Sequence, residues 1–141
     1  MPLSPEFDYF DVAADVGVRA RGTTLAEAAS ALAQGVFNLL VPIRAVEPRE
    51  PRHVTVEGSD EAALLVNWIN ELLYLHDTEG WLLARAEVDL CVPPRLAARV
   101  IGERFEEGRH PRGTLVKAAT YHNLAIVTTP EGVCVRMVLD V

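Results

Sequence analysis

The stretch WLLARAEVDLCVPPRLAARVI, residues 81–101, decides the fold class, because it joins two runs of strand-forming residues through a short turn. Apolar residues that alternate with charged or small ones predict strands over Leu82–Val92 and Leu96–Ile101. The rest of the C-terminal part has the same character after a loop over residues 102–113, and a Pro-Glu-Gly hairpin turn precedes its last run. The further predicted strands are Leu115–Tyr121, Leu124–Thr128 and Val133–Val141.

The part before residue 81 is predicted to supply two helices. A capping-box pattern at Thr24 and Glu27 begins the first helix, and Pro42 ends it. A cap at position 59 or 60 begins the second, whose broad apolar face predicts that a sheet covers it, and Gly80 stops it. The predicted polar face of the first helix comprises Glu27, Ser30, Gln34 and Asn38, and the other extended runs are Phe7–Arg21 and His53–Glu57.

Two helices among about seven mostly sequential strands indicate an α+β fold with mainly antiparallel sheet. At 141 residues the chain is long enough to bury a core and too short for two ordinary domains. We therefore expect a single domain over residues 1–141.

Composition and charge indicate a globular chain with little affinity for nucleic acid or membranes. Half of the residues are apolar, 23% are charged and the net charge is −7, with acids and bases spread over both halves. The absence of a basic block disfavours strong non-specific binding to nucleic acid. No apolar run approaches the roughly 20 residues of a membrane helix, and no signal peptide is recognisable. We expect a cytoplasmic protein that binds neither membranes nor DNA.

The rare residue types give two further expectations. Cys91 and Cys134 each stand between apolar neighbours, which favours buried thiols in strands over a disulfide framework. Lys117 is the only lysine among thirteen basic residues. A lysine at this one position either meets a need for a compact ammonium group with three hydrogen-bond donors or is there by chance.

The sequence matches no enzyme template. None of the three serines stands in a Gly-x-Ser-x-Gly elbow, since Ser4 falls in an N-terminal tail, Ser30 in a helix and Ser59 at a cap. There is no phosphate-binding loop, no dinucleotide fingerprint and no zinc-ligand spacing among the histidines. We therefore expect a protein that is not itself an enzyme.

Carboxylates gather at the end of the last predicted strand. Asp140 is followed by Val141, whose main-chain carboxylate lies beside it in the sequence. If the N-terminal extended stretch pairs beside the last strand, Asp15 adds a third carboxylate. Such a group either recruits a hard cation or raises its own pKa values. The alternatives are a solvated acidic end and, for Asp15, a simple turn former.

Two other charged stretches are candidate contact surfaces. Asp77 and Glu79 place acids at a helix C-terminus, where the dipole is unfavourable to them, which marks either a functional position or a backbone-bonding turn. The loop with Arg109 and His110 is either a partner surface or a solvated charged face. In the predicted strand after it, alternation places Lys117 and His122 on opposite faces.

A set of short pieces spread over nearly the whole chain resembles one family, the archeases. The pieces are Ala14-Asp15-Val16-Gly17, the Leu25–Leu40 helix, Asn70-Glu71-Leu72-Leu73-Tyr74-Leu75, Asp77-Thr78-Glu79-Gly80, Gly102-Glu103 with Phe105, Arg109-His110-Pro111, Val116-Lys117-Ala118 with Thr120-Tyr121-His122, and Leu139-Asp140-Val141. Two departures accompany them. Val12-Ala13 stands where the family usually has His-Thr, and the segment between Val88 and Leu96 is shortened, with Pro93-Pro94 in a tight turn.

The resemblance implies a strand-helix-strand-strand-like fold and a role as protein cofactor of an RtcB-type RNA ligase. Archeases promote guanylylation of the ligase histidine and multiple turnover in tRNA splicing and RNA repair, so RNA would be contacted only through the ligase. The family's metal site corresponds to Asp15, Asp140 and Val141, whose oxygen ligands favour Ca²⁺, Mg²⁺ or Mn²⁺. The candidate partner-binding residues are Lys117, His122, Arg109, His110 and Asp77.

Three other functions are weighed against this one. A chaperone-like adaptor for other nucleic-acid-processing proteins would act without Asp15 and without a metal. A small-ligand-binding module would need an apolar pocket lined by residues such as Trp68 and Trp81. A hydrolase would need a nucleophile that the sequence does not offer.

Overall fold

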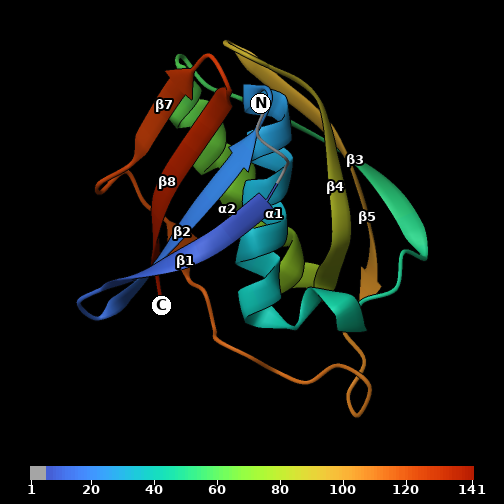
Figure 1. The fold of residues 1–141 in the computed structure, drawn as a ribbon. Helices are drawn as coiled ribbons and strands as arrows, with labels where there is room; N and C mark the ends of the chain where they lie inside the picture. Colours follow the sequence, from blue (N-terminus) through green and yellow to red (C-terminus); the bar gives the residue numbers. More distant parts are fainter. Residues whose placement is uncertain (1–5) are drawn as a thin grey trace.

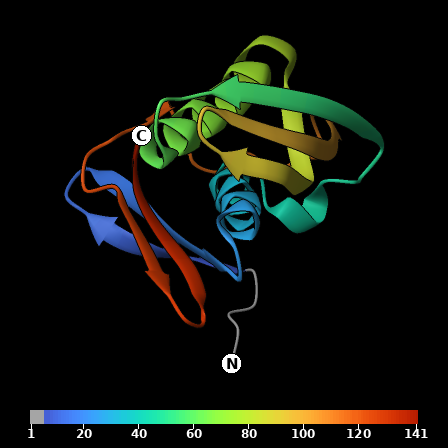
Figure 2. The same cartoon turned by 90° about the horizontal axis from the view of Figure 1, so that it is seen from above.

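The computed structural model describes residues 6–141, in which two antiparallel sheets lie on either side of the first long helix (Figures 1 and 2). The five-stranded sheet contains β1 (Glu6–Val12), β2 (Asp15–Gly22), β8 (Gly132–Asp140) and β6 (Ala118–Ala119) in this order, and β7 (Ala125–Thr129) also pairs with β8. The three-stranded sheet has the order β3 (Glu50–Glu57), β5 (Arg95–Arg104), β4 (Trp81–Val92). The helices are α1 (Leu25–Leu40), the short 3₁₀ turn η1 (Ile43–Ala45) and α2 (Glu61–Glu79).

The predicted fold class is confirmed, since two principal helices accompany strands that all pair antiparallel. The helix boundaries follow the predicted signals. The Thr24 hydroxyl accepts the Glu27 N–H, Asp60 caps α2 in the same way, and Gly80 ends α2 with a left-handed backbone. Neither long helix in residues 6–141 has the length and apolarity that a bilayer crossing demands. The predicted place of Ser4 in a tail lies outside the described residues.

Two polar residues of α1, Ser30 and Gln34, lie against the edge of the three-stranded sheet. β4 is an edge strand, and two of its backbone N–H groups donate to side chains of α1. The Ala86 N–H donates to Gln34 Oε1 at 3.2 Å, and the Val88 N–H donates to the Ser30 hydroxyl at 3.0 Å. These bonds satisfy donors that would otherwise stay unpaired at a covered edge. The helix therefore joins the two sheets through hydrogen bonds as well as apolar packing.

The core fills the space between the sheets and the helices. Trp68 of α2 is completely buried and donates its indole N–H to the Ala29 carbonyl of α1 at 3.0 Å. Both cysteines are free thiols, as predicted, and Cys91 is buried whereas Cys134 is half-buried. Burial raises the pKa of the Cys91 thiol to about 11, so this thiol is unreactive at neutral pH.

One strand prediction is wrong over most of its length. Leu115–Tyr121 was expected to be a strand, but only Ala118–Ala119 pairs, with the end of β8. The segment before it is held instead by α1, since the Gly113 and Thr114 N–H groups donate to the Leu40 and Leu39 carbonyls. Alternation in the sequence does not show whether a neighbouring backbone is available for pairing, and a strand needs one.

Candidate functional site at the acidic end of the large sheet

The pairing of β2 with β8 brings Asp15 and Asp140 to the same end of the five-stranded sheet. Val16 lies opposite Leu139, so Asp15 and Asp140 are the next residues on these two neighbouring strands. Directly opposed side chains on adjacent strands have Cβ atoms about 4.5–5.5 Å apart. The N-terminal stretch thus lies beside the last strand through β2, while β1 forms the outer edge.

A tight turn positions Asp15 at the start of β2. Val12 and Asp15 pair across a two-residue connection, in which Ala14 has a left-handed backbone with φ of 64°. This conformation is uncommon for residues other than glycine. The turn falls beside Val12-Ala13, where the chain departs from the archease pattern, and Asp15 itself is half-buried.

The segment with Lys117 is fixed to Asp140 through the backbone. The Lys117 N–H donates to the Asp140 carbonyl at 2.8 Å, and Ala118 pairs with Asp140. The Asn70 side chain of α2 accepts the Ala119 N–H at 2.8 Å, which clamps this segment to the helix. The sequence indicates no role for Asn70, because only the structure shows which backbone group its side chain bonds.

The carboxylates at this end are accessible to solvent. Asp140 is exposed, Val141 is half-buried, and neither aspartate forms an ion pair within residues 6–141. No group of three His, Cys, Asp or Glu side chains in the described chain is arranged to hold a metal. A metal here would need the Val141 main-chain carboxylate as a third source of oxygen, beside the two aspartates. Such a set of oxygen donors fits a hard divalent cation.

The other predicted contact residues lie in different surroundings. Lys117 is exposed without an ion pair in the described part of the chain, and His122 is exposed beside Asn123, whose amide lies 3.3 Å from the His122 ring. Asp77 is exposed at the end of α2. Its neighbour Glu79 pairs with Arg52 at 2.9 Å, which lowers the Glu79 pKa and explains that acid structurally. Whether these residues bind a partner stays a prediction.

Arg109 and His110 contact a buried carboxylate that the sequence did not reveal as their partner. Glu103 is only 4% exposed; it binds the Arg109 guanidinium through both oxygens and accepts the Glu47 N–H at 2.7 Å. His110 accepts the Glu106 N–H at Nδ1, so its proton lies on Nε2 and points to Glu103. The only sequence signal for the pairing of Glu103 with Arg109 and His110 is that acidic residues alternate with basic ones in this loop, and this signal does not identify the partner. His110 is only 3% exposed, and a contact of Arg109 and His110 with a partner stays a prediction.

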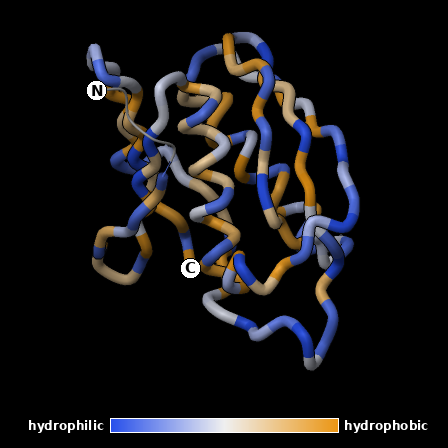
Figure 3. The backbone as a smooth tube through the Cα atoms, turned by 45° about the vertical axis from the view of Figure 1, so that its right-hand side comes forward, coloured by the Kyte–Doolittle hydropathy of each residue, from blue (hydrophilic) through white to orange (hydrophobic). Residues whose placement is uncertain are grey.

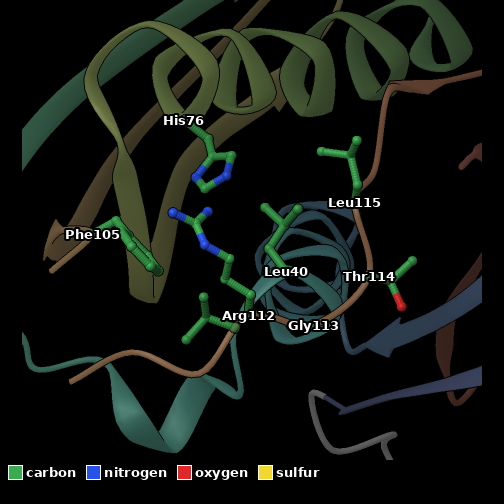
Figure 4. Close-up of a pocket in the computed structure, with 8 residues that line it drawn as sticks. Leu40, His76, Phe105, Arg112, Gly113, Thr114 and Leu115 are labelled. Atoms are coloured by element: carbon green, nitrogen blue, oxygen red, sulfur yellow. The ribbon is translucent and has the colours of Figure 1, made fainter. Parts of the chain in front are cut away.

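The same loop, which protrudes below the sheets and is mostly hydrophilic (Figure 3), leads back over a small cavity of about 80 Å³. His76, Phe105, Arg112 and Leu115 line this cavity, and Figure 4 shows the His76 ring and the Arg112 guanidinium pointing toward one another. His76 donates from Nδ1 to the Trp81 carbonyl at 2.9 Å, and Arg112 stacks on Phe105. The first contact ties the end of α2 to the start of β4, and the second lies within the loop.

The model of the archease protein family (MTH1598/TM1083) matches residues 7–141. The chain belongs to the archease family. Thermococcus gammatolerans Protein archease is 41% identical over 129 residues, covering 89% of this chain and 91% of that protein. Sulfurisphaera tokodaii Protein archease is 35% identical over 137 residues, covering 96% and 99%. The solution structure of Methanobacterium thermoautotrophicum protein 1598 superposes with a TM-score of 0.80 at 32% identity, over 96% of this chain and 98% of that one.

This result confirms the resemblance and identifies the fold as the archease fold. Membership of the family implies a role as a protein cofactor or activator, with a protein partner in RNA processing. Asp15 and Asp140 therefore meet at an exposed end of an archease sheet, which gives the proposal below its starting point.

Proposed function

We propose that this archease is a cytoplasmic protein cofactor that activates an RtcB-type RNA ligase. In this role it would promote attachment of GMP to the ligase's histidine and allow multiple turnover in tRNA splicing or RNA repair. The meeting of Asp15 and Asp140 on neighbouring strands at an exposed end carries the proposal, since it supplies accessible acidic groups at one place. The chain itself is proposed to form no covalent intermediate.

The acidic end is proposed to hold a divalent ion, Ca²⁺, Mg²⁺ or Mn²⁺. Asp15, Asp140 and the main-chain carboxylate of Val141 would be its ligands, since all their donors are oxygen atoms. A bound ion would supply positive charge to a phosphate at the ligase site. The chain's own contribution is positional, because the Lys117 N–H bonds the Asp140 carbonyl and Asn70 fixes the following backbone.

Activation requires that this archease binds one state of the ligase better than the others. A partner shifts a conformational equilibrium only through such a difference in affinity. We propose that the acidic end and the exposed Lys117 ammonium contact the guanylylation-competent state, where an ammonium has phosphates or acidic side chains to bind. Arg109, His122 and Asp77 are proposed to extend this contact surface, and the buried His110 is proposed to support the loop that carries Arg109.

The test is a multiple-turnover ligation assay with the RtcB-type ligase of the same organism, GTP, Mn²⁺ and an RNA pair ending in 3′-phosphate and 5′-hydroxyl. Ligase–GMP formation is followed alongside. Asp15→Asn and Asp140→Asn remove charge at the acidic end, and Asp89→Asn, an exposed residue of β4, is the matched control. We expect the native protein and Asp89→Asn to stimulate both steps and the other two variants to lose stimulation.

Three outcomes would contradict parts of the proposal. Equal stimulation by all variants keeps the ligase as partner and removes the acidic end from the mechanism. No stimulation by the native protein removes the ligase, and protection of varied unfolded clients would then support the adaptor function. Saturable binding of a small apolar ligand in place of both would support the binding-module function.

A further inference from the structure

The outward face of the five-stranded sheet carries a basic groove. Strands β1, β2, β8 and β7 lie side by side in Figure 1. Val18 and Ala20 of β2 are completely buried in the core, so Arg19 and Arg21 between and after them face outward. Arg136 of β8 faces the same way, between the buried Val135 and Met137. A groove of about 250 Å³ is lined by these arginines and by Ala125, Val127 and Cys134.

The arginines in this groove exceed their acidic partners. Arg19 and Arg136 are directly opposed on neighbouring strands, and like charges in that position are destabilising. Asp8 on β1 binds Arg19 at 2.8 Å and Arg21 at 2.9 Å, and Glu6 binds Arg21 at 3.2 Å, so the three arginines have two acidic partners. No carboxylate within residues 6–141 forms an ion pair with Arg136. The groove thus contains a cation without a counter-charge, although the whole chain is strongly acidic.

An aromatic ring holds the unpaired guanidinium in place. The Phe10 ring lies directly on Gly17, where a Cβ atom would come within 2.2 Å of it. The guanidinium carbon of Arg136 lies 4.4 Å from the centre of this ring, and that of Arg19 lies 5.5 Å away on the same ring. Stacking restricts the guanidinium plane and leaves its N–H donors unused by any acid. An oriented guanidinium of this kind suits a phosphate oxygen pair.

The opposite wall of the groove is apolar. Val127 of β7 is 53% exposed there, directly across from Cys134, and Ala125 lies across from Arg136. Proteins that bind single-stranded nucleic acid combine positive charge with side chains against which bases pack, most often aromatic rings. In this groove the exposed aliphatic surface of Val127 and Ala125 would take that place beside the guanidinium groups. A chain of alternating phosphates and bases fits both walls, whereas an acidic peptide uses only the arginines.

The groove and the acidic end share one face of the sheet. Arg136 precedes Asp140 by four residues on β8, and Arg19 follows Asp15 by four residues on β2. Four residues of strand span about 13 Å. Between Arg136 and Asp140, Val138 is almost completely buried, and the Phe10 ring lies over Gly17, which pairs with Val138. An elongated ligand that is bound at Arg136 would therefore pass over this covered region to reach the carboxylates, where the proposed metal would meet a phosphate.

We propose that this groove binds a single-stranded RNA directly, with a phosphate on Arg136 and a base against Val127. The inference rests on the proposed function for the presence of RNA, and it replaces a purely indirect contact with RNA by a direct one. The net charge of −7 limits this contact to a local one, so binding by the isolated protein is weak and specific to the groove. The bound strand is directed toward Asp140.

The test measures binding of a fluorescent ten-nucleotide RNA with a 3′-phosphate to the protein alone, by anisotropy, over a series of salt concentrations. Arg136→Ala should weaken binding about tenfold, the loss of one charged hydrogen-bonding contact. It should also reduce the slope of log affinity against log salt by about 0.7, the value for one phosphate contact on a single strand. Arg95→Ala, the same charge change at the start of β5, should leave both quantities unchanged.

A second pair of variants leaves the arginines untouched. Val127→Glu places a negative charge at the exposed apolar wall and should abolish binding, while Val127→Thr should bind within twofold of native protein. If the groove binds an RNA strand, free GMP and inorganic phosphate should displace the labelled RNA only at concentrations far above that of an unlabelled RNA competitor. Thermal unfolding of each variant shows that the fold is intact.

Several results would overturn the inference. Undetectable binding at millimolar protein, or equal binding by Arg136→Ala and Val127→Glu, removes the groove as an RNA site. Equal competition by an oligoglutamate peptide of the same charge assigns the groove to an acidic protein, and equal competition by GMP assigns it to a free nucleotide. None of these binding measurements contains the ligase. A negative result here therefore leaves the proposed ligase activation standing, because that proposal is tested separately with the Asp15 and Asp140 variants in the ligation assay.

Discussion

The Nε2–H group of His110 donates a hydrogen bond of 2.9 Å to Oε2 of Glu103, and both side chains are almost completely buried. The other ring nitrogen of His110 accepts the Glu106 N–H, so the imidazole is neutral in this arrangement. Arg109 and Arg49 both form ion pairs with Glu103, and Arg109 binds both of its oxygens. This network joins the loop after β5 to the end of the strand that precedes it.

Replacing Glu103 should destabilise the protein strongly. Glu103→Gln keeps the shape but removes the charge, which leaves Arg109 without its buried partner and costs about 2–4 kcal/mol of unfolding free energy. Urea unfolding measures this difference. The matched control is Glu87→Gln, whose exposed carboxylate pairs with Arg99 at 3.0 Å and should change stability by less than about 0.5 kcal/mol. Similar losses in the two variants would contradict the structural role of Glu103.

The stabilisation by Glu103 should disappear in acid. Hydrogen bonds from Arg109 above all hold the pKa of Glu103 at about 2, below its ordinary value of 4.5. A lowered pKa gives stability that is complete above pH 4.5 and is lost as the pH falls toward 2. The free-energy gap between native protein and Glu103→Gln should therefore be constant from pH 8 to pH 6 and shrink at pH 3. A gap of the same size at pH 3 would show that Glu103 protonates normally.

Hydrogen exchange should detect each of the two hydrogen bonds between α1 and the edge of β4 separately. Gln34→Ala removes the acceptor for the Ala86 N–H, and Ser30→Ala removes the acceptor for the Val88 N–H. Each change should cost about 1 kcal/mol and speed hydrogen exchange at its own amide. The two variants are controls for each other. Equal acceleration at both amides in either variant would indicate general loosening of the helix.

The stability of the fold should depend on glycine at position 17, because the Phe10 ring occupies the space that a side chain there would need. Gly17→Ala places a methyl group where the Phe10 ring lies, and the forced shift should cost about 1–3 kcal/mol. In the Phe10→Ala background the same glycine substitution should cost much less, since the obstacle is gone. A double-mutant cycle from urea unfolding measures this coupling. A coupling energy near zero would show that the ring moves aside freely.

A divalent ion at the acidic end should stabilise the folded protein. Ligands that bind only the native state raise its stability by about 2.7 kcal/mol at one hundred times their dissociation constant. Thermal unfolding with increasing Ca²⁺ or Mn²⁺ should thus show a rising midpoint that Asp15→Asn and Asp140→Asn abolish. Asp89→Asn should respond as the native protein does. A midpoint that rises equally in all four proteins would place the ion elsewhere.

The elements with local signals were predictable, and the site was predictable only in part. The cap at Thr24 and the stop at Gly80 depend on residues beside them, so the helix ends follow from sequence. The polar positions of α1 were correct, but no local signal showed that Gln34 meets the edge of β4 and not water. Asp15 approaches Asp140 only because two strands that are distant in the sequence pair with each other. The sequence could not predict this pairing, so the approach of the two aspartates followed only if the pairing was assumed.

The pairing of Val16 with Leu139 joins segments from opposite ends of the chain. Closing so long a loop carries an entropic cost, and contacts between distant segments slow folding in general. A partly synthesised or locally unfolded archease that lacks β8 in its place still carries Asp15 but presents no second aspartate beside it. The acidic end is thus complete only when the whole sheet is assembled.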